Sequence, residues 1–165
     1  MEYQIKNISG EVIFTAEAES FKEVVEKAVV HGANLERANL AWANLRGAKL
    51  EEANLAWANL EGAKLGRASL EEANLAWADL RGASLEGADL EKANIGRADL
   101  EGANLERANL AWADLRGADL EGAKLDRANL GWANLAWAKL KKASLEGANL
   151  EEANLAWADL RGAKR

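Results

Sequence analysis

Alanine recurs at every fifth residue from Ala33 to Ala163, and a leucine follows each alanine two residues later from Leu35 to Leu160, with Ile95 as the one exception. A period of five fits neither regular element. Five helical residues turn through roughly 500°, so the leucines would circle the helix, and an odd period in a strand would send them to alternate faces. The Ala–Leu spacing instead places both side chains on one side of a short extended segment, and the longer step to the next alanine leaves room for a corner. We therefore predict a solenoid that bends at every fifth residue and fills its axis with leucine.

The repeated unit is a small residue, then Asn or Asp, then Leu, then two variable residues. It is seen in ANLERANLAWANL (Ala33–Leu45) and in ADLRGADLEGAKL (Ala113–Leu125). On these motifs the chain resembles the pentapeptide repeat family across residues 33–165, about four fifths of the sequence. The resemblance implies an all-β solenoid, a right-handed quadrilateral β-helix with four pentapeptides per coil. Ala and Leu would face inward and the other three positions outward. About seven coils, spaced ~4.8 Å apart, would give a rod ~32 Å long.

The first 32 residues differ from the repeats. Two β-rich runs, Tyr3–Ile8 and Val12–Ala16, predict strands joined by a two-residue hairpin turn at Ser9–Gly10. Ser20 and Glu23 have the spacing of a capping box at the start of an amphipathic helix.

A glycine at position 32 would end that helix. Because terminal units of repeat proteins cover the open end of the stack, we predict an N-terminal cap at residues 1–32 and a β-helix at residues 33–165. The two parts would be continuous as one folding unit. The N-terminal segment also resembles the cap of prophage-type pentapeptide proteins.

Partners and location are predicted mainly from what the sequence lacks. No comparable cap follows Leu160, so we expect self-association through an uncapped C-terminal coil. A net charge of -6 has the wrong sign for a nucleic-acid binder, so no nucleic-acid partner is expected. Neither a signal peptide nor a long apolar run is apparent, which favours a cytoplasmic protein without membrane contact, or a synthetic one with no native compartment.

The residues available for catalysis are few, and we expect no enzyme activity and no catalytic, cofactor or metal site. There is no cysteine, and the single histidine, His31, falls at the end of the predicted helix, where it suits the helix dipole. The serines lie in a turn, at a helix cap and at repeat positions usually held by Asn or Asp. The glycines occur singly at the expected corners and form no phosphate-binding loop.

All seven tryptophans occupy the last position of a pentapeptide, which the family resemblance directs outward. Three pairs are separated by 20 residues and would stack on adjacent coils. We expect the arginines that follow four residues after a tryptophan to place guanidinium groups over the indoles; they are Arg46, Arg81, Arg116 and Arg161. The indoles could simply pack on the surface, or they could bind a protein, a sugar or a planar ligand. The candidate binding face comprises Trp57, Trp77, Trp112, Trp132, Trp137 and Trp157.

Two polar columns also follow from a period of 20 residues. One contains asparagines that could bond to one another or brace their own corners: Asn34, Asn54, Asn74, Asn94, Asn134 and Asn154. The other is acidic: Glu86, Glu106, Asp126 and Glu146. Some family members resemble duplex DNA and act on DNA gyrase, so the acidic column raises a DNA-mimic hypothesis, although Arg67, Arg107 and Arg127 lie in the next column and dilute the negative field.

The regularity of the repeat bears on origin and function. AWADLRGA occurs three times, starting at Ala76, Ala111 and Ala156, and no inward alanine is replaced. We interpret the chain as a designed or consensus solenoid, whose function is to be a non-enzymatic structural and display scaffold with no evolved ligand. The alternatives are a gyrase-directed DNA mimic and a module that binds protein or ligand through its tryptophan columns.

Overall fold

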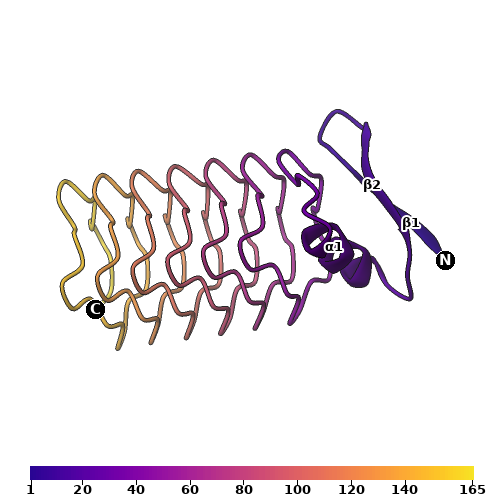
Figure 1. Ribbon diagram of the computed structural model, residues 1–165. Helices are drawn as coiled ribbons and strands as arrows, with labels where there is room; N and C mark the ends of the chain where they lie inside the picture. Colours follow the sequence, from indigo (N-terminus) through magenta and orange to yellow (C-terminus); the bar gives the residue numbers. More distant parts are fainter.

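The computed structural model describes residues 1–165 and contains a β-hairpin, a helix and a rod of stacked coils (Figure 1). Strand β1 (Glu2–Lys6) pairs antiparallel with β2 (Val12–Glu17), and α1 (Phe21–Val30) follows. The hairpin and α1 lie at the N-terminal end of the rod. Val24, Val25 and Ala28 of α1 are buried in the same hydrophobic core as the first leucines of the coils.

The hairpin connection is longer than the sequence predicted. Residues 7–11 join the strands, so the expected two-residue turn at Ser9–Gly10 is wrong. The cause is Asn7, whose side-chain oxygen accepts hydrogen bonds from the N–H groups of Ser9 (2.9 Å) and Glu11 (3.0 Å). An asparagine that bonds its own following backbone stabilises a wider turn, and a register shift after Ile5 accommodates it.

The N-terminus of α1 is capped nearly as predicted. The Ser20 hydroxyl accepts a hydrogen bond from the Glu23 N–H at 3.2 Å. The Glu23 carboxylate reaches back to the N–H of Glu19 (2.8 Å), one residue earlier than in a standard capping box. At the other end, His31 Nδ1 lies 2.7 Å from the Lys27 carbonyl oxygen, and Gly32 has a φ of 66°. His31 therefore closes the helix, as its position in the sequence suggested.

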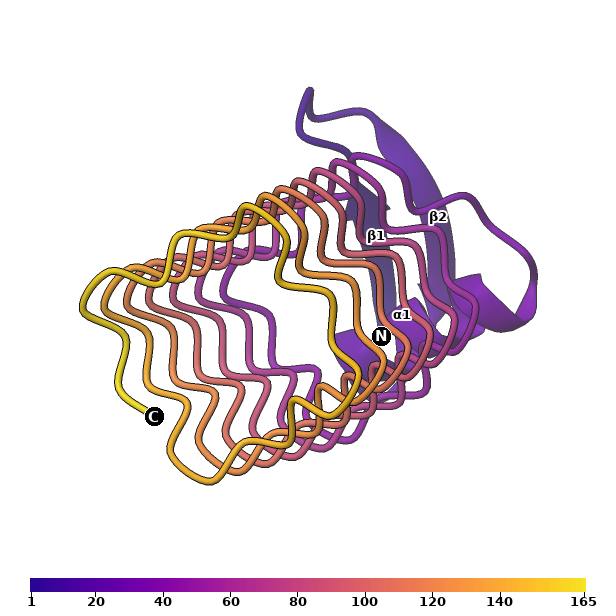
Figure 2. The same cartoon turned by 90° about the vertical axis from the view of Figure 1, so that its left-hand side faces the viewer.

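Residues 33–165 form the predicted right-handed quadrilateral β-helix. Parallel bridges join residues 20 apart along the rod, from Asn39 with Asn59 to Ser144 with Lys164. The view along the axis shows the four-sided outline of the stacked coils (Figure 2). Because four pentapeptides make one coil, each side chain lies directly above or below those 20 residues away.

All five backbone N–H groups of residues 98–102, a pentapeptide with Asp at its second position, have a partner. The N–H groups of Asp99, Leu100 and Gly102 bond to carbonyls of neighbouring coils at 2.7–3.0 Å. The Ala98 N–H bonds to the Ile95 carbonyl (3.2 Å) and closes the preceding corner. The fifth donor, the Glu101 N–H, bonds to the Asp99 side chain at 3.1 Å. The unit favours Asn or Asp at its second position because a short side-chain acceptor is needed there.

Alanine and leucine fill the axis as predicted. The leucines from Leu35 to Leu145 are at most 3% exposed, and no polar side chain is buried. Leu150, Leu155 and Leu160, in the C-terminal coil, are partly buried because only one neighbouring coil covers them. Four small residues at the fourth position of the unit, which was assigned outward, are also buried: Ala56, Gly66, Gly131 and Ala136.

The last residue of each pentapeptide adopts the left-handed backbone conformation. The seven tryptophans have φ between 60° and 64°, and Gly102 and Gly117 share the same conformation at 66°. A non-glycine residue pays of order 1 kcal/mol or more for it. Glycine, arginine, lysine, glutamate and tryptophan all occur at this position, so the corner backbone is set by the hydrogen bonds of the coil and not by the side chain it carries.

Candidate functional site

Four of the six candidate tryptophans lie at a single corner of the rod. We call the column at that corner the tryptophan corner, and each of its residues follows the previous one by 20: Arg37, Trp57, Trp77, Arg97, Gly117, Trp137 and Trp157. All of its tryptophans are exposed, from 43% for Trp77 to 78% for Trp157. The coil ladder therefore stacks an aromatic and cationic column on the outside of the protein.

The tryptophans stack in pairs, as their spacing predicted. The ring centroids of Trp57 and Trp77 are 4.8 Å apart and the rings are inclined by 4°. Trp137 and Trp157 are 5.6 Å apart and inclined by 17°. Offset stacks of this kind contribute about 0.5–1.5 kcal/mol each. The tryptophan corner thus has two stacked pairs separated by the coils of Arg97 and Gly117.

The remaining tryptophans lie at other corners. Trp112 and Trp132 form a stacked pair, with centroids 5.0 Å apart, at the corner that precedes the tryptophan corner in each coil. Trp42 lies at the corner that follows it, and its indole covers Gly62 on the next coil. The candidate residues therefore do not form one continuous aromatic face.

The predicted cation–π contacts of Arg46, Arg81, Arg116 and Arg161 are wrong, since none of these guanidinium groups lies over an indole ring. Arg81, Arg116 and Arg161 each bind the aspartate two residues earlier, with Nη2 2.6 Å from Oδ2 of Asp79, Asp114 or Asp159. A residue four positions after a tryptophan lies at the next corner of the coil, whereas the aspartate lies on the approach to the arginine's own corner. The matched fork geometry then favours the carboxylate.

These ion pairs lower the pKa values of the three aspartates. Hydrogen bonds from the Arg81 and Arg116 side chains lower the pKa of Asp79 and Asp114 below the usual value. The Arg161 side chain lowers the pKa of Asp159 to about 2. All three carboxylates are therefore charged at neutral pH and hold their arginines against the coil.

Arg97 makes the cation–π contact that does form, over the ring of Trp77. Its guanidinium carbon lies 4.8 Å from the centroid of the Trp77 ring, the same separation as between Trp57 and Trp77. Arg97 follows Trp77 by 20 residues, so the period of the coil, and not the four-residue spacing, was the signal for this interaction. The guanidinium continues the indole stack by one step, as a cation over an aromatic face.

The next position of the tryptophan corner has no side chain, because it is Gly117. A groove of about 830 Å³ lies around this gap and is lined by Trp77, Arg97, Arg116, Trp137 and Lys139, among others. The sequence analysis did not identify it. Its signal was a single glycine in a column otherwise filled with tryptophan and arginine.

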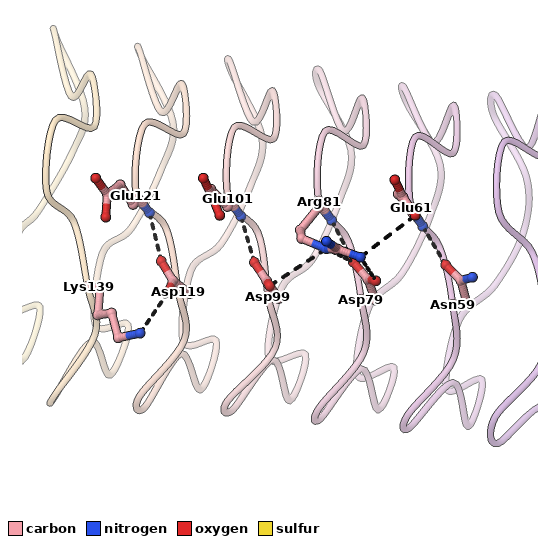
Figure 3. A network of polar contacts seen from close by, with 9 residues as sticks. All are labelled: Asn59, Glu61, Asp79, Arg81, Asp99, Glu101, Asp119, Glu121 and Lys139. Carbon is pink, nitrogen blue, oxygen red and sulfur yellow. Dashed lines mark hydrogen bonds and ion pairs between the residues drawn. The ribbon is translucent and has the colours of Figure 1, made fainter.

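A polar network lies on the side of the rod between the tryptophan corner and the next corner (Figure 3). Asp79, Asp99 and Asp119 stack on successive coils, where like charges repel. Arg81 offsets part of this repulsion, since its Nε also lies 3.8 Å from Asp99. Lys139 binds Asp119 at 2.8 Å. Two cations, Arg81 and Lys139, therefore offset part of the charge of the three aspartates.

The predicted asparagine column forms, and its side chains both bond to one another and brace their own corners. The amide of Asn74 donates to Asn54 on the preceding coil at 3.2 Å, and its oxygen accepts the N–H of Ala76 at 3.2 Å. The acidic column also forms, but the cavity beside it is lined by acids and arginines together: Glu106, Arg107, Asp126, Arg127, Glu146 and Gly147. Its negative charges therefore alternate with positive ones.

Other classes of site have little support in the geometry. Nowhere do three or more His, Cys, Asp or Glu side chains gather in a group that could hold a metal ion. The one helix, α1, lacks the length and apolar character needed to span a bilayer.

Comparisons with known proteins agree with the repeat geometry. The model of the family described as pentapeptide repeats (8 copies) matches five overlapping ranges, residues 31–67, 58–96, 68–107, 93–131 and 128–164. A comparison with curated protein sequences gave no match.

Solved structures of repeat proteins are also similar. HetL, a pentapeptide repeat protein involved in heterocyst differentiation regulation in the cyanobacterium Nostoc, is 36% identical over 76% of this chain and 75% of its own, with a TM-score of 0.49. A pentapeptide repeat protein of the Arabidopsis thaliana thylakoid lumen is 34% identical over 52% of this chain and 59% of its own, with a TM-score of 0.50. QnrB1, a plasmid-mediated fluoroquinolone resistance protein, is 22% identical over 76% of both chains, with a TM-score of 0.40.

The five-residue period, the four-sided coils and the family match over residues 31–164 agree with one another. The chain belongs to the pentapeptide repeat family.

Proposed function

We propose that the protein is a non-enzymatic structural scaffold that displays side chains at the corners of a rigid rod. This proposal rests on the observation that the bonds which hold the coil together do not use the side chains displayed at its corners. The backbone bonds of residues 98–102 involve only backbone groups and the Asx oxygen of Asp99. The exposed corner position accepts tryptophan, arginine, lysine, glutamate or glycine on one backbone conformation. Side chains can therefore change there without altering the coil.

A substitution experiment tests the scaffold. Glu52, Glu72 and Lys92 are consecutive residues of one corner column, and all three already have positive φ. A variant with tryptophan at all three positions should keep the parent far-ultraviolet spectrum and unfold within a few degrees of it. The matched control places aspartate at Leu70 and Leu90, two buried positions on the same side, and should not fold. Loss of structure in the tryptophan variant would contradict the display proposal.

We also propose that the sequence is a consensus or computational design, because every inward alanine and nearly every leucine is retained. Consensus repeats are usually much more stable than natural ones. The expected thermal midpoint is therefore above ~90 °C. A midpoint in the mesophilic range of ~45–65 °C would count against a designed origin.

Two further interactions stay as predictions. A DNA mimic would protect gyrase in a supercoiling assay, but the arginines interleaved with the acidic column do not favour this activity. Self-association through the C-terminal coil would bury Leu150, Leu155 and Leu160, which are partly exposed. Light scattering over a range of concentrations tests it directly.

A further inference from the structure

The tryptophan corner contains a gap that is one ring thick. Its column advances in steps of 4.8 Å from Trp57 to Trp77 and from Trp77 to the guanidinium of Arg97. Gly117 supplies no side chain for the next step, and Trp137 resumes the stack after it. Two coil spacings therefore separate the Arg97 guanidinium from the Trp137 ring, about 9.6 Å. A flat ring placed midway would lie ~4.8 Å from each, within the range of stacked aromatic groups.

No side chain of the protein occupies this gap. At Gly62 the equivalent space is covered by the indole of Trp42, so that an added Cβ would clash with it. At Gly117 a Cβ would meet only Cγ of Arg97, at an ordinary contact distance of 3.5 Å. Arg116 is the other long side chain at this point, but Asp114 holds it through Nε (2.9 Å) and Nη2 (2.6 Å).

The charges around the groove indicate the sign of a ligand. Arg116 is paired with Asp114 and Lys139 with Asp119. Asp99 lies 3.8 Å from Nε of Arg81. Arg97 alone among the cations of the groove has no carboxylate within ion-pair distance, and its guanidinium contacts only the Trp77 ring face among charged and aromatic groups. The groove is lined by three cations and three carboxylates, and the cation that borders the gap at Gly117 without an ion-pair partner is Arg97.

The width of the gap and the free guanidinium point to the same class of molecule. We propose that the protein binds a flat aromatic anion between Arg97 and Trp137, in the space left by Gly117. The ring stacks between the guanidinium and the indole, where both a cation–π contact and an aromatic contact are available. Its negative group compensates the charge of Arg97. This binding site goes beyond the scaffold function and does not depend on it.

The test is a titration of the full chain with β-naphthoate, a flat bicyclic carboxylate, followed by nitrogen–proton correlation spectroscopy. Each of the seven tryptophans gives one indole N–H signal, which can be assigned by single substitutions. The Trp137 signal should shift most and saturate, the Trp77 signal should shift less, and those of Trp42, Trp112 and Trp132 should stay in place.

Two substitutions distinguish binding in the gap at Gly117 from non-specific binding to the surface of the protein. Gly117→Trp completes the column and should abolish the saturable shift, since tryptophan already adopts the same backbone conformation at other corners. Gly122→Trp adds the same side chain at the following corner, where an added Cβ meets nothing within 4 Å, and should bind β-naphthoate like the parent. Both variants should show the parent far-ultraviolet spectrum.

The charge requirement has its own comparison. Arg97→Gln should weaken β-naphthoate binding roughly tenfold, as expected for loss of a cation–π contact and a unit charge. The neutral analogue β-naphthamide should bind the parent more weakly than β-naphthoate. The proposal fails if all seven indole signals shift together, if no signal saturates at millimolar ligand, or if Gly117→Trp binds as well as Gly122→Trp. Any of these results would leave the scaffold function unaffected.

Discussion

Truncating one central leucine gives the sharpest test of the axial core. Leu100 is 1% exposed, and its N–H bonds to the Asp119 carbonyl at 2.7 Å, so the backbone around it is fixed by the ladder. Leu100→Ala removes three carbon atoms, worth about 2.4 kcal/mol in transfer free energy at ~0.8 kcal/mol per methylene. A cavity term adds to this where the surroundings cannot collapse. We expect the free energy of unfolding to fall by about 3–4 kcal/mol.

The matched control is Leu155→Ala in the C-terminal coil. Leu155 is only partly buried, because one neighbouring coil covers it, so its truncation should cost about half as much. Guanidinium denaturation followed by far-ultraviolet circular dichroism measures both losses by linear extrapolation. Equal losses for the two variants, or a loss below ~1 kcal/mol for Leu100→Ala, would refute a core whose packing is tightest in the middle of the rod.

Three further outcomes test the surface. Glu101→Lys, at an exposed corner, should change stability by no more than about 0.5 kcal/mol in the same denaturation assay; a loss like that of Leu100→Ala would overturn the outward assignment. A double-mutant cycle with Trp112→Ala and Trp132→Ala should give a coupling of about 0.5–1.5 kcal/mol, and additive losses would mean that the stacked pair contributes nothing beyond burial. Because Asp79 and Asp114 have lowered pKa values, they stabilise the fold above a pH of about 4 and lose this contribution as the pH falls towards those values. The double Asp→Asn variant should therefore lose less stability than the parent in thermal scans below pH 4, and parallel pH profiles would count against the ion pairs.

The fold could be predicted because one pattern determines it repeatedly. An inward leucine such as Leu100 recurs in nearly every unit, and an Asn or Asp acceptor such as Asp99 recurs in most of them; each has a role within its own pentapeptide. Their roles are local in sequence, so they can be inferred without knowing how coils stack.

The surface contacts were harder to predict because they depend on which residues share a corner. Arg81 was expected to cover Trp77, four residues earlier, but one side of the quadrilateral separates them, and Asp79 was the nearer partner. Arg97, which is distant in sequence, makes the contact instead. The hairpin error has a similar cause, since a single side chain, Asn7, decided the turn. For Arg81 the sequence offered two possible partners, Trp77 and Asp79, and the course of the backbone selected Asp79.

The four-sided coil also has a consequence for insertions and deletions. Removing one whole pentapeptide, for example residues 118–122, would leave every remaining alanine and leucine pointing inward, so the stack itself would be preserved. All later corners would nevertheless rotate by a quarter turn relative to the earlier ones, which would carry Trp137 and Trp157 away from the edge they share with Trp57 and Trp77. Only changes by multiples of 20 residues keep the surface in phase. The length of the rod can thus vary in small steps, whereas anything that recognises its exterior constrains the chain to whole revolutions.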